Sequence, residues 1–508
     1  MAPEPQSKKI AVEPWEDKDI LRSDLPSAPL RDIGRILVTG ATGYIGGRLV
    51  FELQSRGYKV RVMVRAASPE YEELWPDAEV MVADALEINS LKKVLDGVDT
   101  AYYLIHSLLL GPKEFASTDI MAAVNFRISA EEKQIKRIIY LGGLGDTRTK
   151  LSPHLASRLR VAEELKCGKV PVTILRAAII IGSGSASYEI IHHLIKVFRV
   201  VPIPRWAKNK CQPIGIRDVI KYLVGVLETL ETSGKYFDIG GNDILTYQIM
   251  LKTISELLNR KNIFISIPFS NIRVYSYLAS LFTPVPAPIT KCLLEGLKNE
   301  VICQNNEIQK ILPFKRLSYR EAIILAMTRE EQDNVHTRWT GAYPPAHELA
   351  IKLHELTDEP KFTASYSIVT KKKASSIFTS ICRIGGKKGW FSRNWMWRMR
   401  GMIDKILLGV GSSRGRRSQT SLKINDVIDF WRIEDIVQNR RVLLRAEMKL
   451  PGLAWLEFKI QDEGGKRKIT VTPYFHTNQL FGRLYWYIMV PFHKFIFTDL
   501  IKQIERIS

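Results

Sequence analysis

A glycine-rich turn near the N-terminus constrains the fold more than any other feature of this sequence. The apolar run RILV (35–38) leads into TGATGYIGG, which spaces Gly40, Gly43 and Gly46 three residues apart. The run predicts a buried strand, and the amphipathic segment 48–56 predicts a helix. Glycines at such a junction permit a tight turn and a close approach of the backbone, so this segment predicts the start of a βαβ unit.

Short β-branched runs then alternate with helix-length segments up to residue 250. These runs are apolar nearly throughout, as in strands that are buried on both faces of a parallel sheet. They lie at 35–40, 58–65, 100–106, 137–143 and 172–181. We therefore expect an α/β fold with a doubly wound parallel sheet of the Rossmann type, and a ligand at the carboxyl ends of its strands.

The turn also indicates what binds there. The first residues of a helix present free N–H groups and a partial positive charge, which together favour phosphate. A glycine turn in this context, with a second strand that ends about 20 residues later, is typical of a dinucleotide site. We expect the dinucleotide to contact the loop residues Gly40, Thr42, Gly43, Tyr44, Ile45 and Gly46.

Arg65 bears on the choice of nicotinamide cofactor. Val64 and Arg65 end the second predicted strand, where a site for NAD(H) would place Asp or Glu against the ribose hydroxyls. A guanidinium there can pair with a 2′-phosphate for about 1.5–3 kcal/mol, whereas a carboxylate would repel it. We therefore favour NADP(H) over NAD(H); the alternative is that Arg65 is a solvated residue at the strand end.

The length of 508 residues suggests several domains. We expect a disordered tail, a Rossmann domain, a helical extension on the substrate side and a C-terminal domain, at 1–32, 33–250, 251–340 and 341–508. The five cysteines are scattered, so we expect a reducing compartment and no metal site. We read neither a signal peptide nor a membrane-crossing run, and we expect a cytoplasmic protein.

The C-terminal domain has the pattern of an antiparallel sheet. Apolar and polar residues alternate along 441–450, and the alternation resumes after a Pro-Gly turn. Such alternation predicts one apolar face and one polar face, with Arg445 and Glu447 on the polar face. The apolar segment 484–507 predicts a long final helix bent near Pro491.

Five motifs together resemble the NmrA-like group of atypical short-chain dehydrogenase/reductases. They are TGATGYIGG (39–47), YYLIHS (102–107), YLGGLG (140–145), LRAAIIIGSGSAS (175–187) and QPIGIRDV (212–219). Segments 426–434, 446–458 and 480–493 resemble a C-terminal domain of unknown function that a subgroup of that family carries. That domain is similar to the α+β helix-grip fold of START and Bet v 1 proteins, in which an antiparallel sheet wraps around a long C-terminal helix.

The helix-grip resemblance implies a cavity that holds an apolar small molecule or lipid, which we expect as the partner of this domain. The residues expected to line that cavity are Leu444, Met448, Leu456, Phe458, Trp486 and Ile488. The alternative is that these side chains fill a solid core.

The NmrA-like resemblance implies further cofactor contacts. Asp84 and Ala85 match the segment whose Asp faces the adenine, and Leu104 and Ile105 match the strand end beside the adenosine half. Asn125 matches an Asn on a helix of the extended relatives.

The expected catalytic position departs from the parent superfamily. Its Tyr-x-x-x-Lys, which moves a proton and holds the nicotinamide ribose, is replaced by His154-x-x-x-Arg158, and its assisting Ser by Gly142-Gly143. Either His154 transfers the proton while Arg158 holds the ribose, or the site only binds cofactor. His106 is a further candidate acid/base, with a structural role as the alternative.

Positive charge is concentrated in one segment. The formal net charge is +21, and residues 361–420 contain 14 Lys and Arg but a single acid, Asp404. Trp390, Trp395 and Trp397 lie among these cations, a mixture that suits peripheral membrane contact through 387–417. Aromatics packed beneath a solvated basic face are the alternative, and the absence of a nucleic-acid motif disfavours RNA or DNA.

Together these features favour an NADP(H)-dependent oxidoreductase that acts on an apolar or lipid-like substrate. The competing hypotheses are a non-catalytic NADP(H) redox sensor or assembly factor with a lipid-binding C-terminal domain, and a lipid carrier in which the nucleotide only stabilises the fold. The changed residues at 154 and 158 favour the first of these rivals. The retained helical spacing favours an enzyme.

Overall fold

The computed structural model describes most of the chain. The described residues are 25–65, 67, 70–106, 115–145, 148–268, 271–331, 337–341, 352–356, 359–386, 389–391, 393–411, 416 and 422–508. Most of the predicted tail at 1–32 and parts of the basic segment 387–417 lie outside them.

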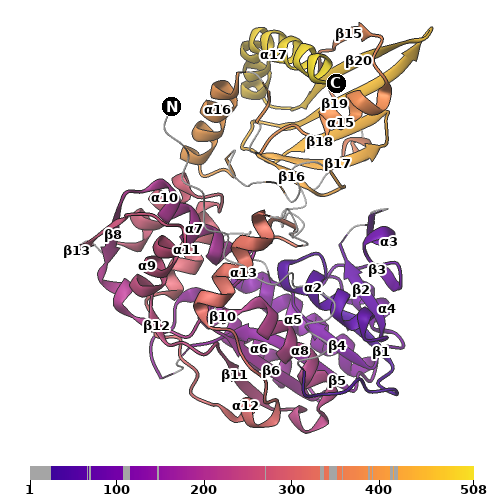
Figure 1. Cartoon of the computed structure of the whole chain (residues 1–508). Helices are drawn as coiled ribbons and strands as arrows, with labels where there is room; N and C mark the ends of the chain where they lie inside the picture. The colour runs from indigo at the N-terminus through magenta and orange to yellow at the C-terminus, as the bar shows by residue number, and fades with distance from the viewer. Residues whose placement is uncertain are drawn as a thin grey trace.

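A seven-stranded parallel sheet forms the centre of the N-terminal domain (Figure 1), in the order β11-β6-β5-β4-β1-β2-β3. Its strands are β1 (Arg35–Val38), β2 (Lys59–Val64), β3 (Ala78–Val82), β4 (Thr100–Tyr103), β5 (Arg137–Gly143), β6 (Val172–Ala177) and β11 (Tyr236–Ile239). The strand order reverses between β1 and β4, so loops diverge there and leave a crevice at the carboxyl ends of the strands. The predicted doubly wound Rossmann sheet is confirmed.

Helices cover both faces of this sheet. Helices α2 (Tyr44–Ser55) and α8 (Ile216–Glu228) pack on the face that Ile36 and Val38 present. Helices α4 (Ile88–Leu95), α5 (Phe115–Glu132) and α6 (Pro153–Lys166) pack on the other face, with Leu37. Adjacent residues of one strand thus enter different cores, which explains why each strand is apolar nearly throughout.

A second layer of strands and helices lies beside the sheet. Strand β8 (Val200–Pro204) pairs in parallel with β13 (Ile263–Ile267), so residues on both sides of position 250 contribute to this layer. One continuous core joins its helices. They are α7 (Ala186–Val197), α9 (Tyr247–Leu257), α10 (Ile272–Phe282), α11 (Ala287–Gly296) and α13 (Tyr319–Glu331).

The C-terminal domain is an antiparallel sheet covered by a long helix, as predicted. Its strands are β14 (Phe362–Thr363), β15 (Tyr366–Thr370), β16 (Val427–Ile428), β17 (Trp431–Val437), β18 (Arg441–Ala446), β19 (Leu453–Glu463) and β20 (Lys466–His476). Its helices are α15 (Ala374–Ile381), α16 (Asn394–Ile406) and α17 (Leu480–Ile507). In Figure 1, α17 lies across the top of this domain, above the sheet. No helix among the described residues is long and apolar enough to cross a membrane.

The inward face of the C-terminal sheet packs against α17. Leu444, Leu456 and Phe458 are buried in one core with residues of α15 and α17. Trp486 is also buried, and its ring is stacked on that of Phe475. Ile488 is 56% exposed, so its prediction as an interior residue is wrong: it lies on the side of α17 that faces away from the sheet.

The outer face of the sheet is less solvated than the alternation suggested. Arg445 and Glu447, predicted on a polar surface, are both buried. Arg432 donates to Glu447 and to the Thr340 carbonyl, which comes from the segment that precedes the C-terminal domain. Other chain segments therefore cover this face, and its charges are paired within the molecule.

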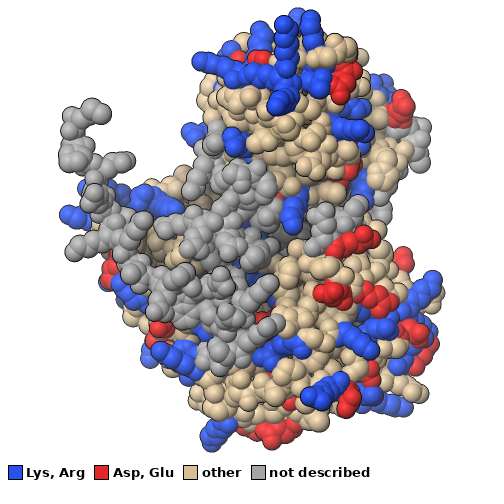
Figure 2. Space-filling view, turned by 45° about the vertical axis from the view of Figure 1, so that its right-hand side comes forward, with Lys and Arg blue, Asp and Glu red and all other residues tan. Residues whose placement is uncertain are grey.

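Charge differs between the two domains. On the face drawn in Figure 2, Lys and Arg side chains gather at the top of the C-terminal domain, whereas both signs are mixed on the N-terminal domain. The tryptophans expected among these cations differ in their environments. Trp390 is buried and stacked on Trp397 at 4.1 Å, so of the three only Trp395 is an exposed residue.

Candidate functional site

The glycine turn after β1 lies at the reversal of strand order. Gly40 has φ +65°, and a Cβ there would lie 2.6 Å from the Leu104 carbonyl oxygen. A Cβ on Gly46 would lie 2.2 Å from the Gly40 carbonyl oxygen. Only glycine therefore fits at either position, and α2 approaches β1 as closely as a phosphate-binding turn requires.

The first turn of α2 is open to a ligand. Gly43 is its N-cap, and no side chain among the described residues makes a capping hydrogen bond there. The first N–H groups of the helix are thus available to an anion, and the helix dipole favours negative charge at this end. The turn fits the pyrophosphate of a dinucleotide.

A cavity of about 460 Å³ extends from this turn along the carboxyl ends of the strands. Most of the site residues predicted from the sequence line it. These are Gly40, Thr42, Gly43, Tyr44, Ile45, Gly46, Arg65, Ala85, Leu104, Ile105, His106, His154 and Arg158.

Two predicted contact residues are absent from its described lining, and both shape the loop after β3. Asp84 is exposed, and its carboxylate accepts a hydrogen bond from the Leu86 N–H at 2.9 Å. Asn125 Nδ2 donates to the carbonyl oxygens of Ala85 and Leu86 at 3.2 and 3.0 Å. Asn125 therefore holds the segment that places Ala85 in the cavity wall.

The end of the cavity beside β2 is an apolar slot with one cation at its rim. Met63, Tyr71 and Ala83 line it, and the sequence had not indicated them. Tyr71 is stacked on Trp75, with ring centroids 5.3 Å apart. Arg65 is exposed directly after β2 and lines the same end of the cavity. The lining of this end is therefore apolar except for the guanidinium of Arg65.

His106 forms a pair with a carboxylate that the sequence had not indicated. Its Nδ1 lies 3.0 Å from Oδ2 of Asp119, a buried residue of α5. Its Nε2 has no hydrogen-bond partner among the described residues. Burial lowers the pKa of His106, Arg158 lowers it further, and Asp119 opposes both. The imidazole is therefore neutral near pH 7, with Nδ1–H directed to Asp119 and Nε2 able to accept a proton.

His154 lies beside His106 in the first turn of α6. The two ring centroids are 5.2 Å apart, and Nδ1 of His154 is buried without a partner among the described residues. Burial holds the pKa of His154 well below its usual value, and His106 and Arg158 lower it further. The structure thus brings together two neutral imidazoles that are 48 residues apart in the sequence.

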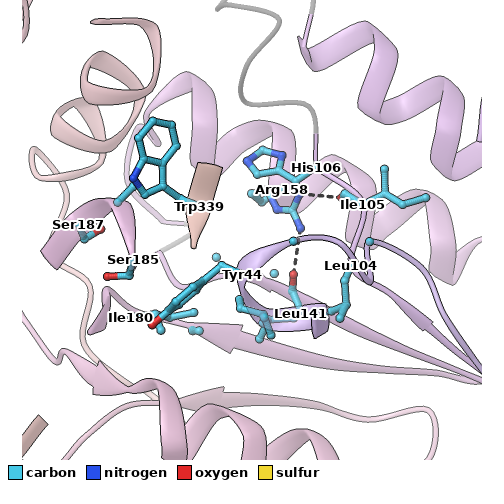
Figure 3. Close-up of a pocket in the computed structure, with 18 of the residues that line it drawn as sticks. Tyr44, Leu104, Ile105, His106, Leu141, Arg158, Ile180, Ser185, Ser187 and Trp339 are labelled. Atoms are coloured by element: carbon cyan, nitrogen blue, oxygen red, sulfur yellow. Dashed lines mark hydrogen bonds between the residues drawn. The ribbon is translucent and has the colours of Figure 1, made fainter. Parts of the chain in front are cut away.

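Arg158 is bound to the ends of two strands (Figure 3). Its Nη2 donates to the Leu141 carbonyl at 2.9 Å, and its Nη1 donates to the Ile105 carbonyl at 3.4 Å. Its guanidinium also lies over the Tyr140 ring. Arg158 therefore fixes the ends of β4 and β5, a positioning task that the spacing alone did not predict.

Comparison with known proteins adds the family. The sequence model of the NmrA-like family matches residues 33–295, about half of the chain. The chain belongs to the NmrA-like family. Residues 356–500 match a second family, described as a protein of unknown function (DUF2867).

Several curated proteins are similar to part of this chain. "NADH dehydrogenase [ubiquinone] 1 alpha subcomplex subunit 9, mitochondrial" of Arabidopsis thaliana is 26% identical over 242 residues, 46% of this chain and 60% of that protein. "Photosystem II assembly factor Ycf39" of Trieres chinensis is 20% identical over 249 residues, 49% of this chain and 76% of that protein. "Ketoreductase sphI" of Aspergillus fumigatus is 30% identical over 112 residues, 20% of this chain and 34% of that protein. The chain spans about three fifths of the length of the first of these relatives.

Solved structures are similar over about three fifths of this chain. The UDP-glucose 4-epimerase of Thermotoga maritima, in complex with UDP-glucose, covers 59% of this chain and 99% of its own, with 16% identity and a TM-score of 0.46. MoeE5 in complex with UDP-glucose and NAD covers the same shares, with 16% identity and a TM-score of 0.47.

The far end of the cavity in this NmrA-like protein is apolar. Its wall comes from the second layer and from the segment before the C-terminal domain, and it includes Ile180, Tyr247, Ile289, Leu293, Val301 and Trp339. The backbone N–H of Trp339 donates to the Gly184 carbonyl at 2.9 Å. In Figure 3, Trp339, Tyr44 and Ser185 lie on one side of the cavity, and His106 and Arg158 lie on the other. Since these segments are far apart in the sequence, only folding brings them together.

Proposed function

We propose that this chain is an NADP(H)-dependent oxidoreductase that acts on an apolar, lipid-like substrate. One observation carries the proposal: a single cavity contains the glycine turn, both histidines and an apolar wall. A polar cofactor and an apolar substrate could thus meet beside His106.

The residues of the cavity suit each part of the cofactor. The N–H groups at the start of α2 would hold the pyrophosphate, and the slot beside Ala85 would hold the adenine. Arg65 would pair with a 2′-phosphate, which NAD(H) lacks. When bound, the nicotinamide supplies or accepts the hydride.

His106 would move the proton. In alcohol oxidation, Nε2 of His106 accepts the hydroxyl proton, while Asp119 stabilises the imidazolium that forms. In carbonyl reduction the same atom returns the proton. His154 lies close enough to share the substrate oxygen, and Arg158 holds the strand ends that carry the site.

The test is turnover by purified full-length protein. We expect NADPH to bind more tightly than NADH, and to be oxidised when some member of a panel of apolar quinones, aldehydes and enones is supplied. Native mass spectrometry of the purified protein should also show an apolar molecule that copurifies. Tight NADPH binding without oxidation by any panel member would argue against the enzyme.

A second candidate function is a nucleotide-dependent sensor or assembly factor. The bonds of Trp339 to Gly184 and of Thr340 to Arg432 link the cavity wall to the C-terminal domain. A nucleotide that changes the position of Trp339 would therefore act on that domain. One relative, Ycf39 of Trieres chinensis, is named an assembly factor. Hydrogen exchange in β17 that changes on NADPH binding, in a protein that oxidises no panel member, would favour this function.

A further inference from the structure

Three helices leave apolar side chains in solvent at helical spacing. On α17 these are Phe481, Leu484, Ile488, Phe492 and Phe495; on α16, Trp395, Met399, Met402 and Ile406; on α10, Val274, Leu278 and Phe282. Each of these side chains is at least 41% exposed. Spacings of three and four residues place each set on one side of its helix, opposite the buried side. We call these twelve residues the three-helix apolar face.

Contacts connect the three helices into one surface. The Arg393 guanidinium, at the start of α16, lies 3.6 Å from the ring centroid of Phe495 on α17. At the other end of α16, Lys405 Nζ donates to the carbonyls of Leu281 and Thr283, at 2.9 and 2.7 Å. In Figure 1, α16 lies between α17, at the top of the picture, and α10, at the left. The surface therefore crosses from the C-terminal domain to the second layer of the N-terminal domain.

This surface is cationic as well as apolar. Arg273, Arg398, Arg483 and Lys494 are exposed on the same helices. The sequence of α10 has no acid, and the acid of α16, Asp404, is fully buried. On α17, residues 480–498 contain no acid, and Asp499 is paired with Arg393. The remaining acid of α17, Glu505, accepts a hydrogen bond from the Thr370 hydroxyl. The acids of these three helices are therefore buried or paired, whereas the four cations are exposed.

We infer that the three-helix apolar face binds the surface of a membrane that contains anionic phospholipid. Exposed apolar patches of this extent mark binding sites, because a water-exposed cluster of large side chains is unfavourable. Anionic headgroups match the four cations, each of which adds about fivefold to affinity near a charged surface. Trp395 would lie at headgroup depth. A second copy of the chain would instead place like charges against one another, which disfavours self-association.

The surface inferred to bind the membrane differs from the one that the sequence predicted. The segment 387–417 contributes through α16, but the larger part of the apolar face belongs to α17 and α10. On the other side of α10, helix α11 supplies Ile289 and Leu293 to the apolar cavity wall. Docking through this face would therefore bring the cavity close to the lipid.

The test is cosedimentation of the full-length protein with vesicles of phosphatidylcholine alone, and of phosphatidylcholine with 30% phosphatidylglycerol. We expect binding to the anionic vesicles that weakens as salt is added. The double variant Phe481→Ser/Ile488→Ser should bind at least about tenfold more weakly. Arg398→Glu/Arg483→Glu should weaken vesicle binding by a similar factor at low salt. The matched control Leu230→Ser/Ile244→Ser, which changes two exposed apolar residues of the N-terminal domain, should bind like the parent.

Circular dichroism and NADPH affinity, measured in parallel, would show that each variant is folded. Failure of the parent protein to bind anionic vesicles would overturn the inference, as would equal binding by the parent and both face variants. The main rival, self-association through this face, is tested by light scattering. If the parent protein is a dimer, Phe481→Ser/Ile488→Ser is a monomer and neither binds vesicles, then the face is a dimer interface and the lipid assignment is refuted.

Discussion

His106 Nδ1 lies 3.0 Å from Asp119 Oδ2, and this pair connects the end of β4 to α5 beneath the cavity. Asp119 is only 2% exposed, so its carboxylate is screened little by water. The pair orients the imidazole as a carboxylate orients the histidine of other acid/base sites. The other ring nitrogen of His106, Nε2, is thereby left unprotonated and can accept a proton.

Replacing Asp119 with Asn should reduce turnover by about tenfold or more, because the amide cannot stabilise the imidazolium. Since Asp119 raises the pKa of His106 against burial, its loss should lower that pKa further. The acidic limb of the rate profile for alcohol oxidation, already below pH 6.5, should therefore move to lower pH. Steady-state kinetics between pH 4.5 and pH 8 would measure this, and an unchanged limb would exclude His106 as the base.

His106→Ala and His154→Ala compare the two candidate bases. We expect His106→Ala to lower kcat by about 10²–10⁴-fold while NADPH affinity stays unchanged. His154→Ala should have the smaller effect, because no carboxylate among the described residues makes a hydrogen bond to its ring. Single-turnover rates with saturating NADP(H) would decide, and intact turnover in His106→Ala would transfer the role to His154.

Arg65→Glu should weaken NADPH binding by at least about tenfold through loss of a charge-assisted pair and added repulsion. Affinity for NADH should change little, because NADH has no 2′-phosphate. Lys59→Glu, an exposed charge reversal at the opposite end of β2, is the matched control. Fluorescence titrations would measure both cofactors; equal losses for NADPH and NADH would refute the proposed preference for NADP(H).

Gly46→Ala should abolish dinucleotide binding and destabilise the fold by about 1–3 kcal/mol. The added methyl would meet the Gly40 carbonyl oxygen at 2.2 Å and push α2 away from β1. Gly296→Ala, in the cavity lining contributed by α11, is a suitable control, because its Cβ would meet no heavy atom within 4 Å beyond its chain neighbours and the backbone of its own helix. Urea denaturation and NADPH titration of both variants would test this, and normal NADPH affinity in Gly46→Ala would show that the turn tolerates a side chain.

Arg432→Met should destabilise the C-terminal domain by about 3–5 kcal/mol, because the buried carboxylate of Glu447 loses its nearer cation and keeps the longer contact to Arg445, at 3.8 Å. Arg432→Met/Glu447→Met should recover part of this loss, since it also removes the buried carboxylate, although Arg445 then loses its contact to Glu447. Thermal denaturation of the two variants gives the comparison. A double variant no more stable than the single variant would mean that the main contribution of Arg432 is its bond to Thr340.

Much of the fold was predictable because it depends on local pattern. The apolar strands of the first domain and the alternation in 441–450 specify parallel and antiparallel sheets through their burial on two faces or one. Alternation could not show what covers the polar face, so the burial of Arg445 and Glu447 was missed. The exposure of Ile488 was missed for a related reason: a nearly continuous apolar helix does not reveal which side meets the sheet.

The sequence by itself determined the dinucleotide turn, since Gly40 and Gly46 are required by backbone geometry within a few residues of one another. Only the tertiary structure decided the chemistry around it. Packing of β4, α5 and α6 brings together His106, Asp119 and His154. It also lets Arg158 donate hydrogen bonds to the ends of two strands that lie far from it in the sequence. Such contacts depend on the three-dimensional path of the chain, which no local spacing encodes.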